Sequence, residues 1–427
     1  MNNIDTSNQP VALTIIADVF GCDRADTALL ASVIASGLAG ARAGLRSGLG
    51  FTSPGFSVVC ASDDPAMARL LKHLIEPANY LQTHLRSHCR SVSAERLDIR
   101  TTVQRLGMRV EPSVAEVEID PFQVTPVGYR RLQAVLHPTM MVTSPDTKTY
   151  ARGLQECADR SPFVFTEGFP APALATALAQ DCAGGDHIFE GPQGSIEKVH
   201  SRLLISCKNK QLQTEFRARN PILDHVLIAG PSRGEKRTIG IEQRRQAESK
   251  YVVAIKESIR SRHCGSGVTF AVKDHVAEFM DNAAAEIDTW VCGLDSSIRP
   301  YLCDASSLPM RLLWSFTLFA IPSDSQLHIG AVETARAILC KSATLLESLA
   351  RAGYDDEEIV MLGKLNEKPQ PFRGLVRRYS RQQRAVHEPV LGRLMGKGYV
   401  AETNNLLQVT EPGREHLNHA HMSMRAS

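Results

Sequence analysis

Apolar residues in the first 240 positions follow two recurring patterns, one with helical spacing and one of short apolar runs. Residues 26–45 place Leu, Ile, Val and Ala every three or four positions, which predicts a helix with one buried face, although its glycines weaken the second half. Helical patterns also occur at 65–75 and 172–180. The alternation predicts an α/β fold, a mostly parallel sheet with covering helices. The runs predicted as strands are 56–60, 139–142, 163–166, 187–189, 203–206 and 226–229.

The pattern becomes wholly helical after residue 240. Residues 272–291, 308–321 and 329–352 carry apolar side chains at helical spacing, and the first of these segments is amphipathic. We therefore predict an all-helical extension over residues 241–351. Residues 233–262 hold nine basic and four acidic side chains, and either a binding channel or a solvated helix face accounts for that excess.

The last part of the chain, residues 352–427, predicts three helices followed by a β-hairpin. Residues 355–368 form the first helix, 372–379 the second, and a capping pattern at Ser380 starts a third that ends at Gly396. Strand, turn and strand follow at 399–409. This order predicts a winged helix-turn-helix. Residues 394–400 and 409–417 resemble the hydrophobic wing and the Thr-x-x-Gly-Arg ending of MarR-like winged helices.

Charge indicates a partner for this C-terminal part. Residues 364–397 contain nine basic and two acidic side chains, whereas the whole 427-residue chain has a net charge of only +2. Clustered cations on a helix that enters a groove favour contact with double-stranded DNA, and a docking module for another protein is the alternative. Pro389 should kink the third helix. The predicted DNA contacts are Arg373, Arg377, Arg378, Arg381, Gln382, Arg384, Arg393 and Lys397.

Composition excludes several classes of protein. No apolar run approaches the ~18–20 residues of a membrane-spanning helix, and the first ten residues lack the order of a secretory signal, so we expect a cytoplasmic protein without membrane contact. Ten cysteines occur without a C-x-x-C pair, which favours reduced, mostly buried thiols over a disulfide scaffold or a zinc site. His84, His88 and Cys89 are not completed by a second cluster of ligands. We expect no metal and no cofactor.

Motifs for catalysis are absent or incomplete. The chain has neither the G-x-x-x-x-G-K-[ST] loop that holds nucleotide phosphates nor G-x-G-x-x-G. Residues 230–234 fit G-x-S-x-G, but a polar loop follows where a nucleophile elbow needs a helix, so Ser232 is better explained by a surface turn. Residues 191–195 resemble a phosphate-binding turn, but Pro192 removes an amide donor.

The order of these parts resembles the primase-helicase-like ATPases of phages, prophages and other mobile elements, which carry a RecA-like core, a helical extension and often a winged helix. The resemblance places Asp63 and Asp64 in the phosphate loop, where two carboxylates would repel phosphate. It aligns 187–191 with the Walker B strand, so that Glu190 matches the catalytic glutamate while the magnesium-binding aspartate is missing. Asn209 corresponds to the polar sensor, and His225 stands where an arginine is usual.

The resemblance implies three domains: a degenerate RecA-like α/β domain over 1–240, the extension over 241–351 and the winged helix over 352–427. It further implies a DNA-binding protein of a mobile element, accessory to replication or defence, with a catalytically inactive body that forms a homo-oligomer or binds a protein partner. Two alternatives remain open. One is a divergent ATPase that uses Glu190 as base with Lys208 or Arg233 on phosphate, and the other is a winged-helix transcriptional regulator.

Overall fold

The computed structural model divides the chain into two compact units, Met1–Leu345 and Leu346–Ser427. The charged stretch 92–118, with four arginines and five acidic residues, lies almost entirely outside the residues that the structure describes. Those residues are 8–40, 43–47, 50–93, 141–157, 161–189, 195–263, 268–296, 298–302, 304–322, 324–352, 356–369, 371, 390–403 and 405–425.

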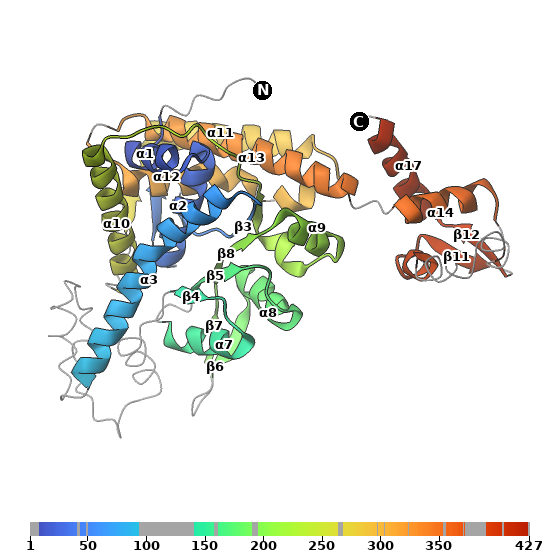
Figure 1. Ribbon diagram of the computed structural model, residues 1–427, viewed down its shortest axis with the longest axis horizontal. Coiled ribbons are helices and arrows are strands. Elements are labelled where there is room, and N and C mark those ends of the chain that lie inside the picture. Colours follow the sequence, from blue (N-terminus) through green and yellow to red (C-terminus); the bar gives the residue numbers. More distant parts are fainter. Residues whose placement is uncertain are drawn as a thin grey trace. The chain divides into compact units, whose positions relative to one another are not determined.

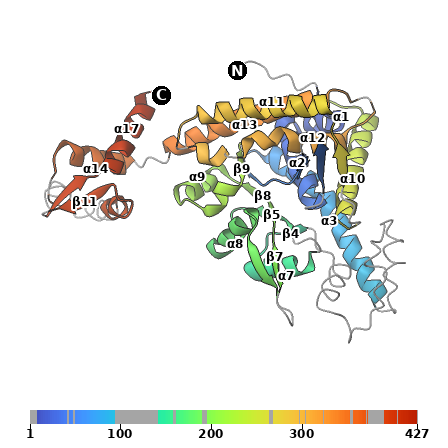
Figure 2. The ribbon, with the colours of Figure 1, turned by 180° about the vertical axis from the view of Figure 1, so that it is seen from behind.

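The first unit is an α/β structure in which a parallel sheet lies among helices. Figures 1 and 2 draw strands β3, β5 and β8 between helix α2 on one side and helices α8 and α9 on the other. Its helices are α1 (Val11–Phe20), α2 (Arg24–Ala39), α3 (Pro65–Ser93), α7 (Thr147–Glu156), α8 (Pro172–Cys182), α9 (Asn209–Arg217), α10 (Ile241–His263), α11 (Asp274–Cys292), α12 (Leu308–Phe319) and, up to Leu345, α13 (Leu327–Ala352). Its 3₁₀ turns are η1 (Pro221–His225), η2 (Arg299–Leu302) and η3 (Ala305–Ser307).

The central sheet has five parallel strands in the order β4-β5-β8-β3-β9. Its strands are nearly continuous apolar runs, as expected for a parallel sheet that is buried on both faces. The predicted runs at 56–60, 139–142, 163–166, 203–206 and 226–229 all contribute to it. The observed bounds are β3 (Val58–Ala61), β4 (Met141–Thr143), β5 (Phe163–Glu167), β8 (Arg202–Cys207) and β9 (Leu227–Ala229).

The sixth predicted strand lies elsewhere. Strand β6 (Asp186–Phe189) pairs antiparallel with β7 (Ser195–Lys198) in a separate two-stranded hairpin. The assignment of 187–189 to a Walker B strand of the central sheet is therefore wrong. An apolar run of three or four residues identifies a strand but not its partner, and here the partner is its neighbour in sequence.

Helix α2 is shorter than the predicted helix over 26–45. Its start is capped by the Asp23 carboxylate, which accepts from the amides of Ala25 and Asp26, and its end is Gly40 in the left-handed region at φ 76°. Gly40, one of the glycines that weakened the predicted helix, is therefore where the observed helix ends. Beyond it the chain forms β1 (Gly44–Ser47), which pairs antiparallel with β2 (Gly50–Thr52).

The segment after residue 240 belongs to the first unit and is not all-helical. Strand β10 (Thr269–Ala271) pairs in parallel with β1, so segments more than 200 residues apart in this unit share a sheet. Helix α10 packs against α1, α2 and α3, and α12 packs against α2. This corrects the prediction of a purely helical extension.

The second unit joins helices to a β-hairpin around its own small core. Helix α14 (Asp356–Glu367) is followed, among the described residues, by a helical segment at 390–396, strands β11 (Val400–Thr403) and β12 (Leu406–Val409), and helix α17 (Glu411–Arg425). The strands pair antiparallel, with Asn405 in the turn at φ 61°. The buried core side chains are Ile359, Met361, Leu362, Leu365, Val390, Leu391, Leu394, Val400, Leu407, Val409 and Leu417.

Two further expectations concern membrane-spanning helices and cysteine thiols. In the described part of the chain, no helix combines the length and the apolar character needed to cross a membrane. The described cysteines are free, and Cys22, Cys60, Cys157 and Cys207 are buried, whereas Cys292 is exposed.

Candidate functional site

The carboxyl edge of the central sheet brings together three of the residues predicted for a degenerate nucleotide site. Asp63 and Asp64 follow β3, and Asn209 follows β8, the neighbouring strand. Asn209 Nδ2 donates to Asp63 Oδ2 at 2.9 Å. Open parallel sheets bind ligands at this edge, because the loops that leave the strands form a crevice there.

The connection from β3 to α3 is short and its polar groups are already bonded. Only residues 62–64 separate the strand from the helix. Ser62 N donates to Cys207 O at 2.9 Å, and Asp64 N donates to Ser62 Oγ at 3.1 Å. Asp64 Oδ1 accepts from the amide of Ala66 at 2.9 Å, in the place where a helix N-terminus would hold an anion. The chain supplies its own carboxylate to this helix.

Arg233 completes the arrangement from the segment after β9. Its Nε donates to Asp64 Oδ2 at 2.6 Å. The pKa of the Asp64 carboxyl lies below its usual range, chiefly because of the Ala66 amide and then because of Arg233. Arg233 was predicted as a phosphate ligand of a divergent ATPase, but here it neutralises an aspartate.

The 230–234 loop is fixed across the turn between α1 and α2. Asp23 N donates to Ser232 O, and Gly234 N donates to Gly21 O, both at 3.1 Å. Asp26, whose side chain is 3% exposed, accepts from Ser232 N at 2.8 Å and from Lys341 Nζ at 3.0 Å. Burial raises the pKa of Asp26, while Lys341 opposes that rise. Ser232 is exposed, and the next helix, α10, begins only at Ile241. The 230–234 segment is thus a loop, as predicted, and not a nucleophile elbow.

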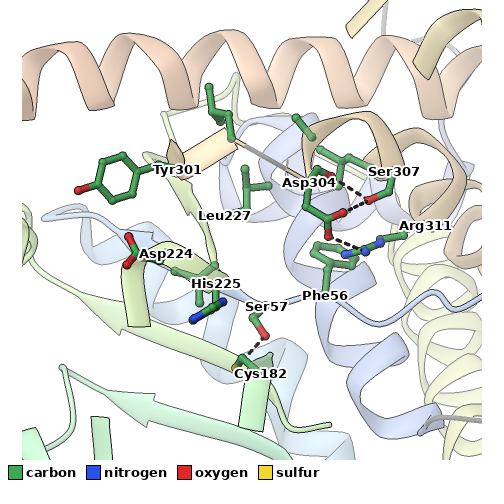
Figure 3. Close-up of a pocket in the computed structure, with 14 residues that line it drawn as sticks. Phe56, Ser57, Cys182, Asp224, His225, Leu227, Tyr301, Asp304, Ser307 and Arg311 are labelled. Atoms are coloured by element: carbon green, nitrogen blue, oxygen red, sulfur yellow. Dashed lines mark hydrogen bonds and ion pairs between the residues drawn. The ribbon is translucent and has the colours of Figure 1, made fainter. Parts of the chain in front are cut away.

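His225 does not belong to this cluster. It lies in η1 and precedes β9, whereas Asp63 follows β3, and the two strands are parallel neighbours. The side chains consequently stand at opposite edges of the sheet. His225 instead lines a cavity at the amino edge, together with Ser57, Cys182 and Arg311 (Figure 3). Its grouping with Asp63, Asp64 and Asn209 is wrong, because a residue before a strand and a residue after its parallel neighbour cannot meet.

One predicted residue of the nucleotide site, Glu190, remains to be placed. Glu190 lies outside the described residues, and so does most of the segment 191–195 that was predicted to resemble a phosphate-binding turn. The described positions contain no cluster of three or more His, Cys, Asp and Glu side chains placed to hold a metal ion.

Two predicted DNA contacts in the second unit have internal partners. Arg393 Nε donates to Glu358 Oε1 at 3.0 Å, and Lys397 Nζ donates to Glu358 Oε2 at 2.8 Å. Glu358 is 2% exposed, whereas the side chains of Arg393 and Lys397 are 47% and 44% exposed. Both cations are thus bound to α14 on one side and open to solvent on the other. The other predicted contacts, Arg373, Arg377, Arg378, Arg381, Gln382 and Arg384, lie outside the described residues.

Sequence reasoning missed the polar residues that surround the amino-edge cavity. Asp304 and Arg311 come from the segment around η3 and α12, and Arg202, which is not one of the residues lining the cavity, begins strand β8. No motif links Asp304 and Arg311 to the other cavity residues: more than 70 residues separate His225 from Asp304 in sequence. Only the fold places them around one cavity.

Comparison of the chain with protein-family models and with curated proteins finds no match.

Proposed function

We propose that this chain binds double-stranded DNA through its second unit, and that its α/β unit acts as a body without nucleotide hydrolysis. The observation that carries the proposal is the charge of residues 364–397, nine basic against two acidic side chains, within a small unit of helices and a hairpin. Phosphate neutralisation by clustered Lys and Arg supplies most sequence-independent affinity for DNA.

The order of elements in the second unit supports a winged helix. The hairpin β11–β12 follows directly after the helical segment at 390–396, and Val400, Leu407 and Val409 of the hairpin share a core with Leu394. In a winged helix this juxtaposition holds the wing beside the recognition helix, so that both approach the duplex from one side.

The buried carboxylate of Glu358 refines which cations bind phosphate. Glu358 already accepts from Arg393 and Lys397, which reduces their net charge toward DNA. The unbalanced charge of the basic segment therefore comes mainly from 364–384. We assign the principal contacts to Arg377, Arg378, Arg381 and Arg384, and secondary ones to Arg393 and Lys397.

The inactive body is inferred from the β3–α3 connection. Three residues are too few to wrap a triphosphate, the helix start is capped by Asp64, and Asp64 is paired with Arg233. Phosphoryl transfer depends on positive charge and amide donors around the phosphates, and negative carboxylates at this position oppose both. A second unit that binds DNA and an α/β unit that binds a protein partner or another copy of the chain fit an accessory role in the replication or defence of a mobile element.

DNA binding is tested by charge removal in the full chain. The variant Arg377→Ala, Arg378→Ala, Arg381→Ala, Arg384→Ala is compared with Lys210→Ala, Arg217→Ala, Arg299→Ala, Arg336→Ala, which removes the same charge from exposed positions of the first unit. Fluorescence anisotropy with a duplex is recorded at several salt concentrations. Each lost phosphate contact flattens the slope of log K against log salt by about 0.9, so the first variant should flatten it by roughly 2 or more.

Two outcomes decide the proposal. Equal affinity and slope for wild type and the first variant, with that variant folded, would make the second unit a protein-docking module. Losses that depend on DNA sequence would favour the transcriptional-regulator alternative, since bidentate Arg contacts with guanine discriminate between bases by ~1–3 kcal/mol. For the body, calorimetry should detect no Mg-ATP binding at millimolar concentration. Hydrolysis that Glu190→Gln abolishes would establish the divergent ATPase instead.

A further inference from the structure

The cavity at the amino edge of the sheet has the size of a small-molecule site. It measures about 320 Å³ and lies where β3 and β9 begin, walled by the chain before each strand and by the η2–η3–α12 segment (Figure 3). Ligand sites in proteins occupy roughly 300–1,000 Å³. All of its walls belong to the first unit.

Arg311 has more donors than partners in this cavity. Its Nη2 forms an ion pair with Asp304 Oδ2 at 2.6 Å, and the side chains are 20% and 67% exposed. Its Nε is buried and makes no hydrogen bond within the described part of the chain. A guanidinium carries five N–H donors in a planar fork, and a buried donor without an acceptor is costly.

A second guanidinium, that of Arg202, carries a charge that interacts with the charge of Arg311. Its pKa is lowered, first by burial and then by the positive charge of Arg311. Arg202 lies across Gly55, where any Cβ would overlap the guanidinium. Its side chain makes no hydrogen bond or ion pair among the residues described, and Asp304 attracts it only at longer range. Asp304, the ion-pair partner of Arg311, is itself mostly exposed.

The opposite wall has a different character. Tyr301, Asp224 and His225 lie at the far side of the cavity from Arg311 (Figure 3). Asp224 repels a second anionic group, so a ligand that spans the cavity carries its anion at one end only. The volume further favours an organic molecule over a bare inorganic ion.

Ser57 and Cys182 of this cavity are not nucleophiles. Ser57 Oγ accepts from the amide of Leu203 at 3.0 Å and contacts Cys182 Sγ at 3.6 Å. Burial raises the pKa of the Cys182 thiol to about 11, which keeps it protonated at neutral pH. The arrangement therefore suits binding without covalent chemistry.

We propose that this cavity binds a small organic molecule with one carboxylate or phosphate group, whose oxygens accept hydrogen bonds from Arg311. The uncharged or cationic remainder of the ligand faces Tyr301, Asp224 and His225. Asp304 is the internal counter-ion that the ligand displaces from Arg311. This site is independent of DNA binding by the second unit.

The test compares three variants of the full chain at constant ionic strength in chloride. Inorganic phosphate is titrated by calorimetry as the simplest occupant of the Arg311 site. Amino acids and sugar phosphates are then screened by thermal shift, which separates carboxylate ligands from phosphate ligands. Arg311→Gln should raise the dissociation constant about tenfold or more, because it removes a charge-assisted hydrogen bond. Arg336→Gln removes an exposed, ion-paired arginine elsewhere in this unit and should change nothing.

Asp304→Asn distinguishes a binding role from a structural one. Removing the competing carboxylate should lower the dissociation constant about two- to fivefold, the range expected for an exposed ion pair. A merely structural Asp304–Arg311 pair predicts no gain in affinity. The proposal is overturned if neither phosphate nor any screened compound binds wild type or Asp304→Asn, or if binding survives Arg311→Gln unchanged.

Discussion

Arg233 Nε lies 2.6 Å from Asp64 Oδ2, although 169 residues separate the two positions in sequence. The pair joins the segment after β9 to the start of α3 at the carboxyl edge of the sheet. Asp64 also caps α3 through the amide of Ala66. One carboxylate therefore does two things at this edge: it closes the helix start to other anions and fixes the loop that crosses it.

We expect Asp64→Asn to lower the free energy of unfolding at neutral pH and to have little effect in acid. Asn keeps the capping acceptor but loses the charge that pairs with Arg233. Folding lowers the pKa of Asp64, so its contribution is present above the pKa of the unfolded chain, about 3.9, and is lost as pH falls through the folded value. Urea unfolding at pH values from 7 down to 2 measures the difference.

Arg233→Gln provides the second arm of a double-mutant cycle. The double variant should lose less stability than the sum of the single variants, because both single changes remove one interaction. A loss for Asp64→Asn that is the same at every pH, or strict additivity, would mean that the 2.6 Å contact contributes no stability.

Glu358 should be a stability determinant of the second unit. Glu358→Gln removes the buried charge that binds Arg393 and Lys397, and we expect a loss of about 1–3 kcal/mol, limited because both cations can turn to solvent. Hydrogen exchange of peptides from α14 and from 390–397 reports this loss locally. Glu402→Gln, an exposed change on β11, is the control and should leave exchange unaltered. Unchanged protection in Glu358→Gln would show that the two ion pairs are dispensable.

The strands of the central sheet could be predicted because burial on both faces demands continuous apolar runs. Phe163 and Leu203 belong to such runs and lie where predicted, in β5 and β8. Pairing was harder to predict, since Ile188 satisfies the same criterion and yet lies in a local hairpin. Short strands such as β10, only three residues long, carry no periodicity to detect.

Whether two predicted site residues meet depends on whether each of them precedes or follows its strand. Asp63 and Asn209 follow their strands and do meet, and that relation was readable from sequence order. His225 precedes its strand, so the same rule would have excluded it. The pairing of Arg311 with Asp304 follows from the packing of segments that share no motif, and the sequence offers no signal for it.

Arg262 should be essential for the packing of α10. This buried residue donates from Nη2 to Gly37 O at 2.7 Å and to Ser161 O at 2.6 Å, linking α10 to α2 and to the chain before β5. Arg262→Leu leaves both carbonyls without this donor, which should cost about 2–5 kcal/mol. Chemical denaturation followed by tryptophan fluorescence measures it, since both tryptophans lie in this unit. Arg245→Leu, exposed on the same helix, should change stability by no more than ~0.5 kcal/mol.

Gly37 and Gly363 predict opposite responses to the same substitution. Both lie within helices, where alanine is favoured over glycine by about 1 kcal/mol. At Gly37, however, a Cβ would overlap the ring of Phe163, which is fully buried in β5, so α2 and the sheet would have to separate. At Gly363 nothing lies within 4 Å of the added atom.

We therefore expect Gly37→Ala to destabilise the first unit by about 1–3 kcal/mol, because overpacking outweighs helix propensity. Gly363→Ala should stabilise the second unit by roughly 0.5–1 kcal/mol. Hydrogen exchange resolved by peptide assigns each change to its own unit, with faster exchange in α2 and β5 for the first variant and slower exchange in α14 for the second. Slower exchange in α2 after Gly37→Ala would contradict the close approach of that helix to Phe163, and with it the tight seating of α2 on the parallel sheet.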